Sequence, residues 1–273
     1  ITPPLRGLLE TYQYHSDKFR FEMVDPDREP QLAEQYAIRA YNTVRFEYDG
    51  ESTTVTEPTE ENLTNAIIKV TRDTQKTACF IEGHGEPALE DESARGLSAL
   101  KRAFEAENYK VEKVLLASLE AIPASCSMVL VTGPDRPFQA NEVAALERYL
   151  ASSGRVLFLL RPRGSDELKP LLATYGVTVE DTVVVDQVIR LFQGPSLGLS
   201  PLVREYGAHE ITANFRQVTM FPMSRSVRAT PDGKAGLTAV ELAKSSESSW
   251  AETDLELLFG QSSASLDEAS DKK

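Results

Sequence analysis

Residues 77–89, TACFIEGHGEPAL, constrain the fold of this chain more than any other stretch. The apolar run 78–81 ends at Glu82 and is followed by two glycines, a histidine and a proline, which is typical of a buried strand that stops at a tight turn. Residues 93–107 then place apolar side chains at helical spacing. A strand, a glycine-rich turn and a helix form the first half of a βαβ unit, so this stretch predicts an α/β domain with a candidate site at the end of its first strand.

The same alternation continues to about residue 185. Strands are predicted at residues 77–82, 110–115, 127–132, 155–160 and 177–185, the last as one long strand or a pair. Helices are predicted at 93–107, 142–151 (with Asn141 as its N-cap) and 166–175. Strands that alternate with helices in this way predict a doubly wound, mostly parallel sheet. Beyond residue 188 the pattern weakens: residues 192–200 indicate a loop, and 216–227 and 237–243 added strands.

Residues 1–74 have a different pattern, with predicted helices at 5–14, 29–36 and 63–72 and predicted strands at 20–24, 42–48 and 52–56. The last two strands are joined by the hairpin signal Asp49-Gly50. This order resembles a thioredoxin-like domain, most closely across VDPDREPQLAEQYAIRAYNTVRFEYDGE. The stretch has no Cys-x-x-Cys, and Asn42 stands where thioredoxins carry a cis-proline. We therefore expect an incomplete thioredoxin-like scaffold without redox chemistry.

Three segments are expected along the chain: the incomplete thioredoxin-like domain at 1–74, the α/β domain at 75–260, and a tail at 261–273. The tail is rich in Ser, Ala, Asp and Lys, a composition typical of disorder. The sequence opens on Ile1 rather than Met, and we expect it to be an excised piece of a longer protein.

The charge balance excludes some classes of partner. The chain has 29 basic and 42 acidic residues, a formal net charge of −13, whereas nucleic acids and anionic membrane surfaces are bound by clustered Lys and Arg. No stretch approaches the about 18 apolar residues of a membrane span, and no signal peptide is recognisable. Contact with a membrane is therefore expected only through helices outside this sequence.

The two cysteines, Cys79 and Cys126, lie 47 residues apart, each beside or inside an apolar strand. The favoured interpretation is two small buried hydrophobic residues, and a disulfide is the alternative. Two cysteines and three histidines without local clustering form no zinc site. We expect neither a metal nor a cofactor.

Three predicted strand ends could form a binding crevice. They carry Gly83, His84, Gly85 and Glu86; Gly133, Pro134 and Asp135; and Arg161 and Arg163. His84 and Glu86 could act as a general base or as metal ligands, but the favoured interpretation is a turn in which His84 bonds the backbone. The two arginines could bind a carboxylate or phosphate, although solvated loop arginines are favoured.

The end of the predicted central strand, Thr132-Gly133-Pro134-Asp135, is where a hydrolase or amidotransferase would carry its nucleophile. Such an elbow needs Ser or Cys at the sharp turn, and neither Gly133 nor Pro134 has a nucleophilic atom. Cys126 lies at the wrong end of the strand. We therefore predict no catalytic residue. His209-Glu210 is interpreted as a cap or turn, and Trp250 as part of a core.

Taken in order, these motifs resemble the GldG-like auxiliary subunits of ABC transporters, first described through gliding motility. The order runs from the thioredoxin-like unit through the strand ending in GHGE, MVLVTGP, LFLLRP and HEITANF to ELAKSSESSW, covering about residues 15–260. The second unit resembles the class I glutamine-amidotransferase-like fold, which is flavodoxin-like, and a domain of an intraflagellar transport subunit.

The resemblance implies a bacterial, extracytoplasmic (periplasmic) protein, tethered to the inner membrane by flanking helices and working with an ABC permease and ATPase. In that family the amidotransferase-like domain is thought to have lost catalysis. We therefore expect a non-enzymatic module whose crevice binds a small molecule, a glycan or a partner loop, with the thioredoxin-like unit as spacer or docking surface.

Two alternatives remain open. One is a hydrolase of sugar or amide bonds that uses His84 and Glu86, with or without a metal ion. Convergence of these two side chains with another histidine or carboxylate would favour it. The other is a structural oligomerisation scaffold, which a large apolar patch or an obligate dimer would favour.

Overall fold

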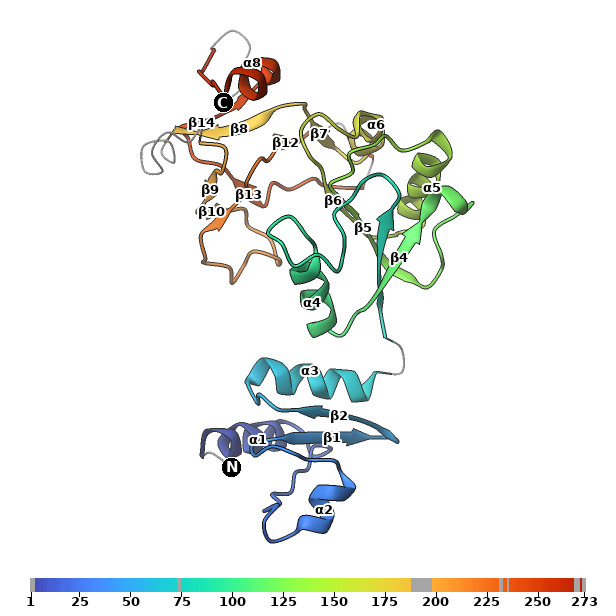
Figure 1. The fold of residues 1–273 in the computed structure, drawn as a ribbon, viewed down its shortest axis with the longest axis vertical. Coiled ribbons are helices and arrows are strands. Elements are labelled where there is room, and N and C mark those ends of the chain that lie inside the picture. Colours follow the sequence, from blue (N-terminus) through green and yellow to red (C-terminus); the bar gives the residue numbers. More distant parts are fainter. Residues whose placement is uncertain are drawn as a thin grey trace. The chain divides into compact units, whose positions relative to one another are not determined.

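The computed structural model describes residues 3–72, 75–187, 198–230, 233–234, 236–267 and 271. The chain divides into two compact units (Figure 1). The first comprises residues 1–78 and 92–111, and the second residues 79–91 and 112–273. No helix among the described residues is long and apolar enough to cross a membrane.

The first unit consists of helices and a two-stranded hairpin, against which α1 and α3 pack. Its elements are α1 (Pro3–His15), α2 (Pro30–Gln35), β1 (Val44–Tyr48), β2 (Glu51–Val55), α3 (Glu60–Thr71) and α4 (Ser98–Ala106). The hairpin is antiparallel, with Phe46 opposite Thr53. The hydroxyl oxygen of Thr59 caps α3 by accepting the backbone N–H of Asn62 at 3.2 Å.

A small apolar core holds this unit together. Its buried members are Leu5, Leu9, Phe46, Leu63, Ala66 and Val70. Residues 20–24 are not a strand, so the prediction there was wrong. Phe19 and Phe21 nevertheless pack on the core, which explains the apolar alternation: the side chains find partners, but no strand in the described part of the chain pairs with this backbone.

The second unit is built on a four-stranded parallel sheet in the order β4-β3-β5-β6. Its strands are β3 (Thr77–Glu82), β4 (Lys110–Leu115), β5 (Cys126–Thr132) and β6 (Val156–Leu159). In the β5–β6 ladder Val129 lies opposite Val156. The predicted α/β class is confirmed at this level, and the four strands were predicted to within one residue at either end.

Helical segments pack against one face of this sheet. They are η1 (Leu116–Ser118), α5 (Ala140–Ala151), η2 (Asp166–Leu168) and α6 (Lys169–Thr174). Val129 and Val131 of β5 contribute to a core that includes Leu146 of α5 and Leu171 of α6. Asn141 is not the N-cap of α5. The cap is Gln139, whose backbone N–H donates to the Glu142 carboxylate at 2.8 Å, as in a capping box.

Within the described ranges, the C-terminal part adds four antiparallel strand pairs. β7 (Val177–Val179) pairs with β12 (Val227–Ala229), and β8 (Val183–Asp186) with β14 (Ser249–Glu252). β9 (Leu202–Val203) pairs with β11 (Thr219–Met220), and β10 (Glu205–Tyr206) with β13 (Ala243–Lys244).

Two of the added strands were predicted too long. The expected strand 216–227 is interrupted by a turn at Pro222, where Met223 has a positive φ of 51°. The expected strand 237–243 contributes only its last residue to a ladder. Residues 177–185 form a pair of strands, one of the two predicted outcomes. Most of the expected loop 192–200 lies outside the described residues.

A third core joins β8, β14 and a helix that the sequence pattern did not indicate, α8 (Leu255–Gln261). Trp250 is buried there against Val185, as predicted. Ala264, which belongs to the segment expected to be a disordered tail, is buried in the same core.

Cys79 and Cys126 form a disulfide between β3 and the first residue of β5. Both residues are buried, as expected, but the favoured interpretation of two unpaired thiols was wrong. β3 and β5 are neighbours in the sheet, and their pairing brings the two Cα atoms to 5.6 Å, within the range that a disulfide spans. Strand order, which the sequence spacing does not show, decides this bond.

Candidate functional site

The turns that follow β3 and β5 are joined backbone to backbone. The carbonyl oxygen of His84 accepts the N–H groups of Asp135 and Arg136, each at 2.8 Å. A Cβ atom at Gly85, where φ is +86°, would lie 3.2 Å from the Cβ of Asp135. Glycine is required here by the backbone conformation and by the close approach of the neighbouring turn. The structure thus brings two of the three predicted strand ends together.

His84 is enclosed by two carboxylates. Its Nε2 atom lies 3.0 Å from Oε2 of Glu142, and its Nδ1 atom 3.3 Å from Oε1 of Glu86. The other Glu86 oxygen accepts the backbone N–H of His84 at 2.8 Å. The imidazole also stacks on Phe138, with ring centroids 4.0 Å apart. The three ionisable side chains are 7%, 0% and 4% exposed for His84, Glu142 and Glu86.

The first turn of α5 positions Glu142. Its Oε2 atom accepts hydrogen bonds from Nε2 of His84 and from the backbone N–H of Gln139. A carboxylate at a helix N-terminus is also favoured by the unpaired N–H groups there. Oε1 of Glu142, Oε1 of Glu86 and Nδ1 of His84 make no aligned hydrogen bond among the described residues. We call His84, Glu86 and Glu142 the buried histidine cluster.

The geometry limits what this cluster can do chemically. A general base needs one ring nitrogen facing a substrate while the other is oriented by a partner. Here both nitrogens of His84 face carboxylates, and the ring is covered by Phe138. Sequence reasoning missed Glu142 and Phe138, although the Gln139-x-x-Glu142 spacing of a capping box was available as a signal.

The sharp turn after β5 carries no side chain at its critical position. Gly133 has a φ of +65°, and its N–H donates to the carbonyl of Leu159 at 2.6 Å. A Cβ atom at this position would lie 2.8 Å from Nε of Arg161. Arg161 thus occupies the space into which a nucleophile would project, and Pro134 follows directly.

The two predicted arginines diverge. Nη1 of Arg161 pairs with Oδ1 of Asp135 at 2.7 Å, and both side chains are partly exposed. Arg163 instead reaches α8, where Nη2 lies 2.8 Å from Oε1 of Glu256 and the guanidinium sits 4.7 Å from the centre of the Phe259 ring. The structure therefore places Arg161 with the β3 and β5 turns and directs Arg163 away from them.

Arg225, which sequence reasoning missed, holds the loop after β6. Its side chain is 2% exposed, and it donates to the carbonyls of Glu180 at 2.7 Å, Gly164 at 2.7 Å and Arg161 at 3.0 Å. Burial lowers the pKa of this guanidinium, and the nearby carboxylates of Asp181 and Asp166 oppose that shift. The loop that carries Arg161 is therefore fixed by a buried cation.

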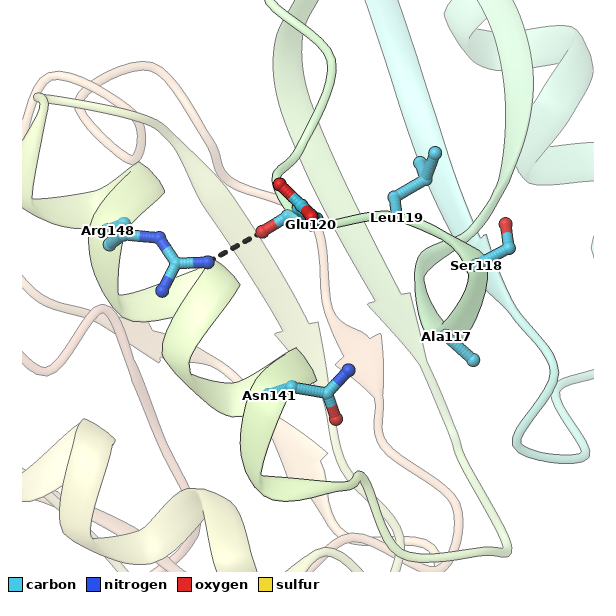
Figure 2. A pocket seen from close by; sticks show the side chains of 6 residues that line it. All are labelled: Ala117, Ser118, Leu119, Glu120, Asn141 and Arg148. Carbon is cyan, nitrogen blue, oxygen red and sulfur yellow. Dashed lines mark hydrogen bonds between the residues drawn. The ribbon is translucent and has the colours of Figure 1, made fainter.

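An open pocket of about 390 Å³ lies between η1 and α5. Figure 2 shows its lining, which comprises Ala117, Ser118, Leu119, Glu120, Asn141 and Arg148. The guanidinium of Arg148 donates to the backbone carbonyl of Glu120 at 2.6 Å. None of the predicted site residues lines this pocket. Among the described residues, no group of three or more His, Cys, Asp or Glu side chains could hold a metal ion.

The fold and these contacts define a mixed α/β protein whose strand ends are tied together by internal polar contacts. Residues 75–273 match the family described as an ABC-type uncharacterized transport system, and the chain belongs to this auxiliary family. No curated protein sequence matches the chain. Among solved structures, it is similar to the mmIFT52 N-terminal domain, with 18% identity, a TM-score of 0.49, and coverage of 64% of this chain and 78% of that one.

Proposed function

We propose that this chain is a non-catalytic, partner-binding component of an ABC transporter, held at the extracytoplasmic face of the inner membrane. Family membership indicates an accessory role in ABC transport. The gliding-motility type, the amidotransferase-like (flavodoxin-like) character of residues 75–260 and the thioredoxin-like character of residues 1–74 belong to this proposal and rest on the motif order.

The observation that carries the non-catalytic assignment is the turn at Gly133. A nucleophile elbow presents its side chain from a residue in a strained, positive-φ conformation after the central strand. Gly133 has that φ without a side chain, and Arg161 fills the adjoining space. An acyl-transfer reaction has no attacking atom at this point of the fold.

The exposed ion pair of Asp135 and Arg161 is what a ligand would meet at the crevice. A carboxylate or phosphate could replace Asp135 on Arg161, while the exposed Gly83 and Gly85 leave the neighbouring backbone accessible to a flat group or a partner loop and the buried Pro134 forms the floor beside them. We propose that the crevice binds through this pair. Arg163 contributes by holding α8 against the same loop.

The disulfide supports the extracytoplasmic location. Disulfides form and persist in oxidising compartments such as the bacterial periplasm and are rare in the cytosol. The bond between Cys79 and Cys126 ties two central strands, so the domain is expected to fold where thiols are oxidised.

Co-purification tests the proposal. The full-length protein is solubilised in mild detergent and its partners are identified by mass spectrometry. Recovery of the permease and ATPase of one transport system in stoichiometric amounts is the expected result. Elution of the protein alone across several detergents would contradict the assignment.

One observation favours a hydrolase as a second candidate. His84 and Glu86 converge with a further carboxylate, Glu142. A histidine placed between two carboxylates is an arrangement that hydrolases use for acid–base catalysis. The burial of all three side chains argues against it, because no substrate atom can reach the ring. Glycosidase and amidase screening of wild type against His84→Ala and Glu86→Ala would decide: activity that both variants lose would establish the enzyme.

A further inference from the structure

Residues 211–230 form a segment without acidic residues in a strongly acidic chain. No Asp, Glu or Lys occurs in it, although the chain as a whole has 42 acidic residues among 273. It contains three arginines, of which Arg225 is buried and bonded to backbone carbonyls. We call residues 211–230 the acid-free segment.

This segment exposes apolar side chains at a high density. Seven of its large apolar residues are each 36–71% exposed: Ile211, Phe215, Val218, Met220, Phe221, Met223 and Val227. Single exposed apolar residues are ordinary on a protein surface, but a contiguous group marks a site of interaction. Six of these residues lie within the thirteen consecutive positions 211–223, where turns and a two-residue strand place them close together along the chain.

The segment is held in place by Tyr206 and by backbone hydrogen bonds to residues 199 and 201. The Tyr206 hydroxyl bonds the carbonyl of Gln217 at 2.8 Å and the Thr219 hydroxyl at 2.7 Å, and its ring packs edge-on against Phe215 at 5.0 Å. Further along, the N–H groups of Phe221 and Met223 donate to the carbonyls of Pro201 and Leu199. The apolar groups are thus displayed from an ordered backbone, which reduces the entropy lost on binding.

Met223 combines two unfavourable features. Its φ is +51°, a conformation in which glycine or asparagine is preferred, and the apolar residue is 38% exposed. Strained residues of this kind cluster at binding sites, and methionine adapts readily to irregular partner surfaces. Burial against a partner would remove the second cost.

Arg216 supplies the charge beside this apolar group. It is exposed, it donates to the carbonyl of Phe215 at 2.8 Å, and no carboxylate within the described ranges forms an ion pair with it. In a chain with a net charge of −13, an arginine without a carboxylate partner next to exposed Phe and Met side chains is complementary to an apolar surface with a carboxylate at its edge.

We propose that the acid-free segment is the docking surface for a protein subunit of the transport system, one that presents an apolar patch edged by a carboxylate. Phe, Met and Arg are enriched at the centres of protein interfaces, and Lys, Asp and Glu are depleted there, which is the composition of this segment. A lipid surface is disfavoured because the acidic remainder of the chain is repelled by anionic headgroups. The inference rests on the proposed function, which supplies the partner.

The test uses the full-length protein expressed with the permease and ATPase of its own system. Phe221→Asp/Met223→Asp places charge in the segment, and aspartate tolerates the positive φ at position 223. Leu237→Asp/Val240→Asp makes the same change at two exposed apolar residues outside it. We expect the first variant to recover at least tenfold less permease, the control to match wild type, and Arg216→Glu to weaken recovery while Arg216→Lys retains it.

A photocrosslinker covers the case in which the first variant fails to fold. Phe221→benzoylphenylalanine should crosslink to a transporter subunit, whereas Leu237→benzoylphenylalanine should not. Equal recovery of permease by all variants, with no crosslink from position 221, would overturn the docking surface and leave the proposed function standing. Failure of wild type to recover the permease would overturn both. Binding of wild type to vesicles of phosphatidylcholine and phosphatidylglycerol (7:3), lost in Phe221→Asp/Met223→Asp, would assign the segment to lipid instead.

Discussion

Oε2 of Glu142 lies 3.0 Å from Nε2 of His84 and 2.8 Å from the backbone nitrogen of Gln139. One oxygen thereby joins the turn after β3 to the start of α5, 58 positions apart in the sequence. The buried histidine cluster therefore connects the turn after β3 to the first turn of α5 and stabilises their packing.

Replacing Glu142 should therefore weaken the fold. Glu142→Ala removes the acceptor of the buried His84 ring and of the Gln139 N–H that caps α5, so we expect the free energy of unfolding to fall by about 3 kcal/mol. Glu147→Ala, on the exposed side of the same helix, is the matched control and should change stability by less than about 0.5 kcal/mol. Urea unfolding followed by circular dichroism measures both. Equal stability of the two variants would mean that the cluster contributes nothing.

Gly133→Ala should lower the free energy of unfolding by more than the positive φ at this position alone explains. An alanine at positive φ costs about 1–2 kcal/mol, and the new Cβ would also meet Nε of Arg161 at 2.8 Å, displacing that side chain from Asp135. Gly236→Ala isolates the first effect, because Gly236 has a φ of +87° with open space around it. Thermal unfolding should show a larger loss for Gly133→Ala. Identical losses for the two variants would show that the contact with Arg161 does not restrict position 133.

The disulfide should stabilise the second unit substantially. Closing a loop of 47 residues in the unfolded chain corresponds to about 4 kcal/mol in the chain-entropy treatment. We expect Cys79→Ala/Cys126→Ala to lose about this amount. Dithiothreitol should lower the unfolding midpoint of wild type and leave the double variant unchanged. An unfolding midpoint of wild type that does not respond to reductant, with both thiols free by alkylation, would show that the bond is absent in solution.

Arg225 and Arg216 lie nine residues apart in the acid-free segment, and only truncation of Arg225 should lower the free energy of unfolding. Arg225→Ala leaves three backbone carbonyls without their buried donor, and we expect a loss of about 3 kcal/mol. Arg216→Ala removes an exposed side chain and should leave stability within about 0.5 kcal/mol, while it weakens partner recovery. Comparable destabilisation by both variants would contradict the assignment of Arg216 to a docking surface.

Local sequence pattern was sufficient for the parts of the chain where periodicity and burial coincide. The strands of the parallel sheet were predicted because each is a short apolar run ended by glycine, proline or charge, as at Glu82 and Gly133. The missing nucleophile was also evident, because Gly133 and Pro134 have no reactive atom in any conformation. The strands β9, β10, β11 and β13 were not recoverable, since ladders of two residues leave no periodic signal.

The sequence alone determined the α/β class, the apolar runs that become strands, the resemblance to an ABC transporter auxiliary family, and the lack of a nucleophile at the central turn. Only the tertiary structure decided that Cys79 pairs with Cys126, that Glu142 contacts His84, and that Arg161 and Arg163 bind different partners. The physical reason is range: propensity and periodicity act over a few residues, whereas these contacts join strands and turns dozens of positions apart. Their existence depends on the order of strands in the sheet.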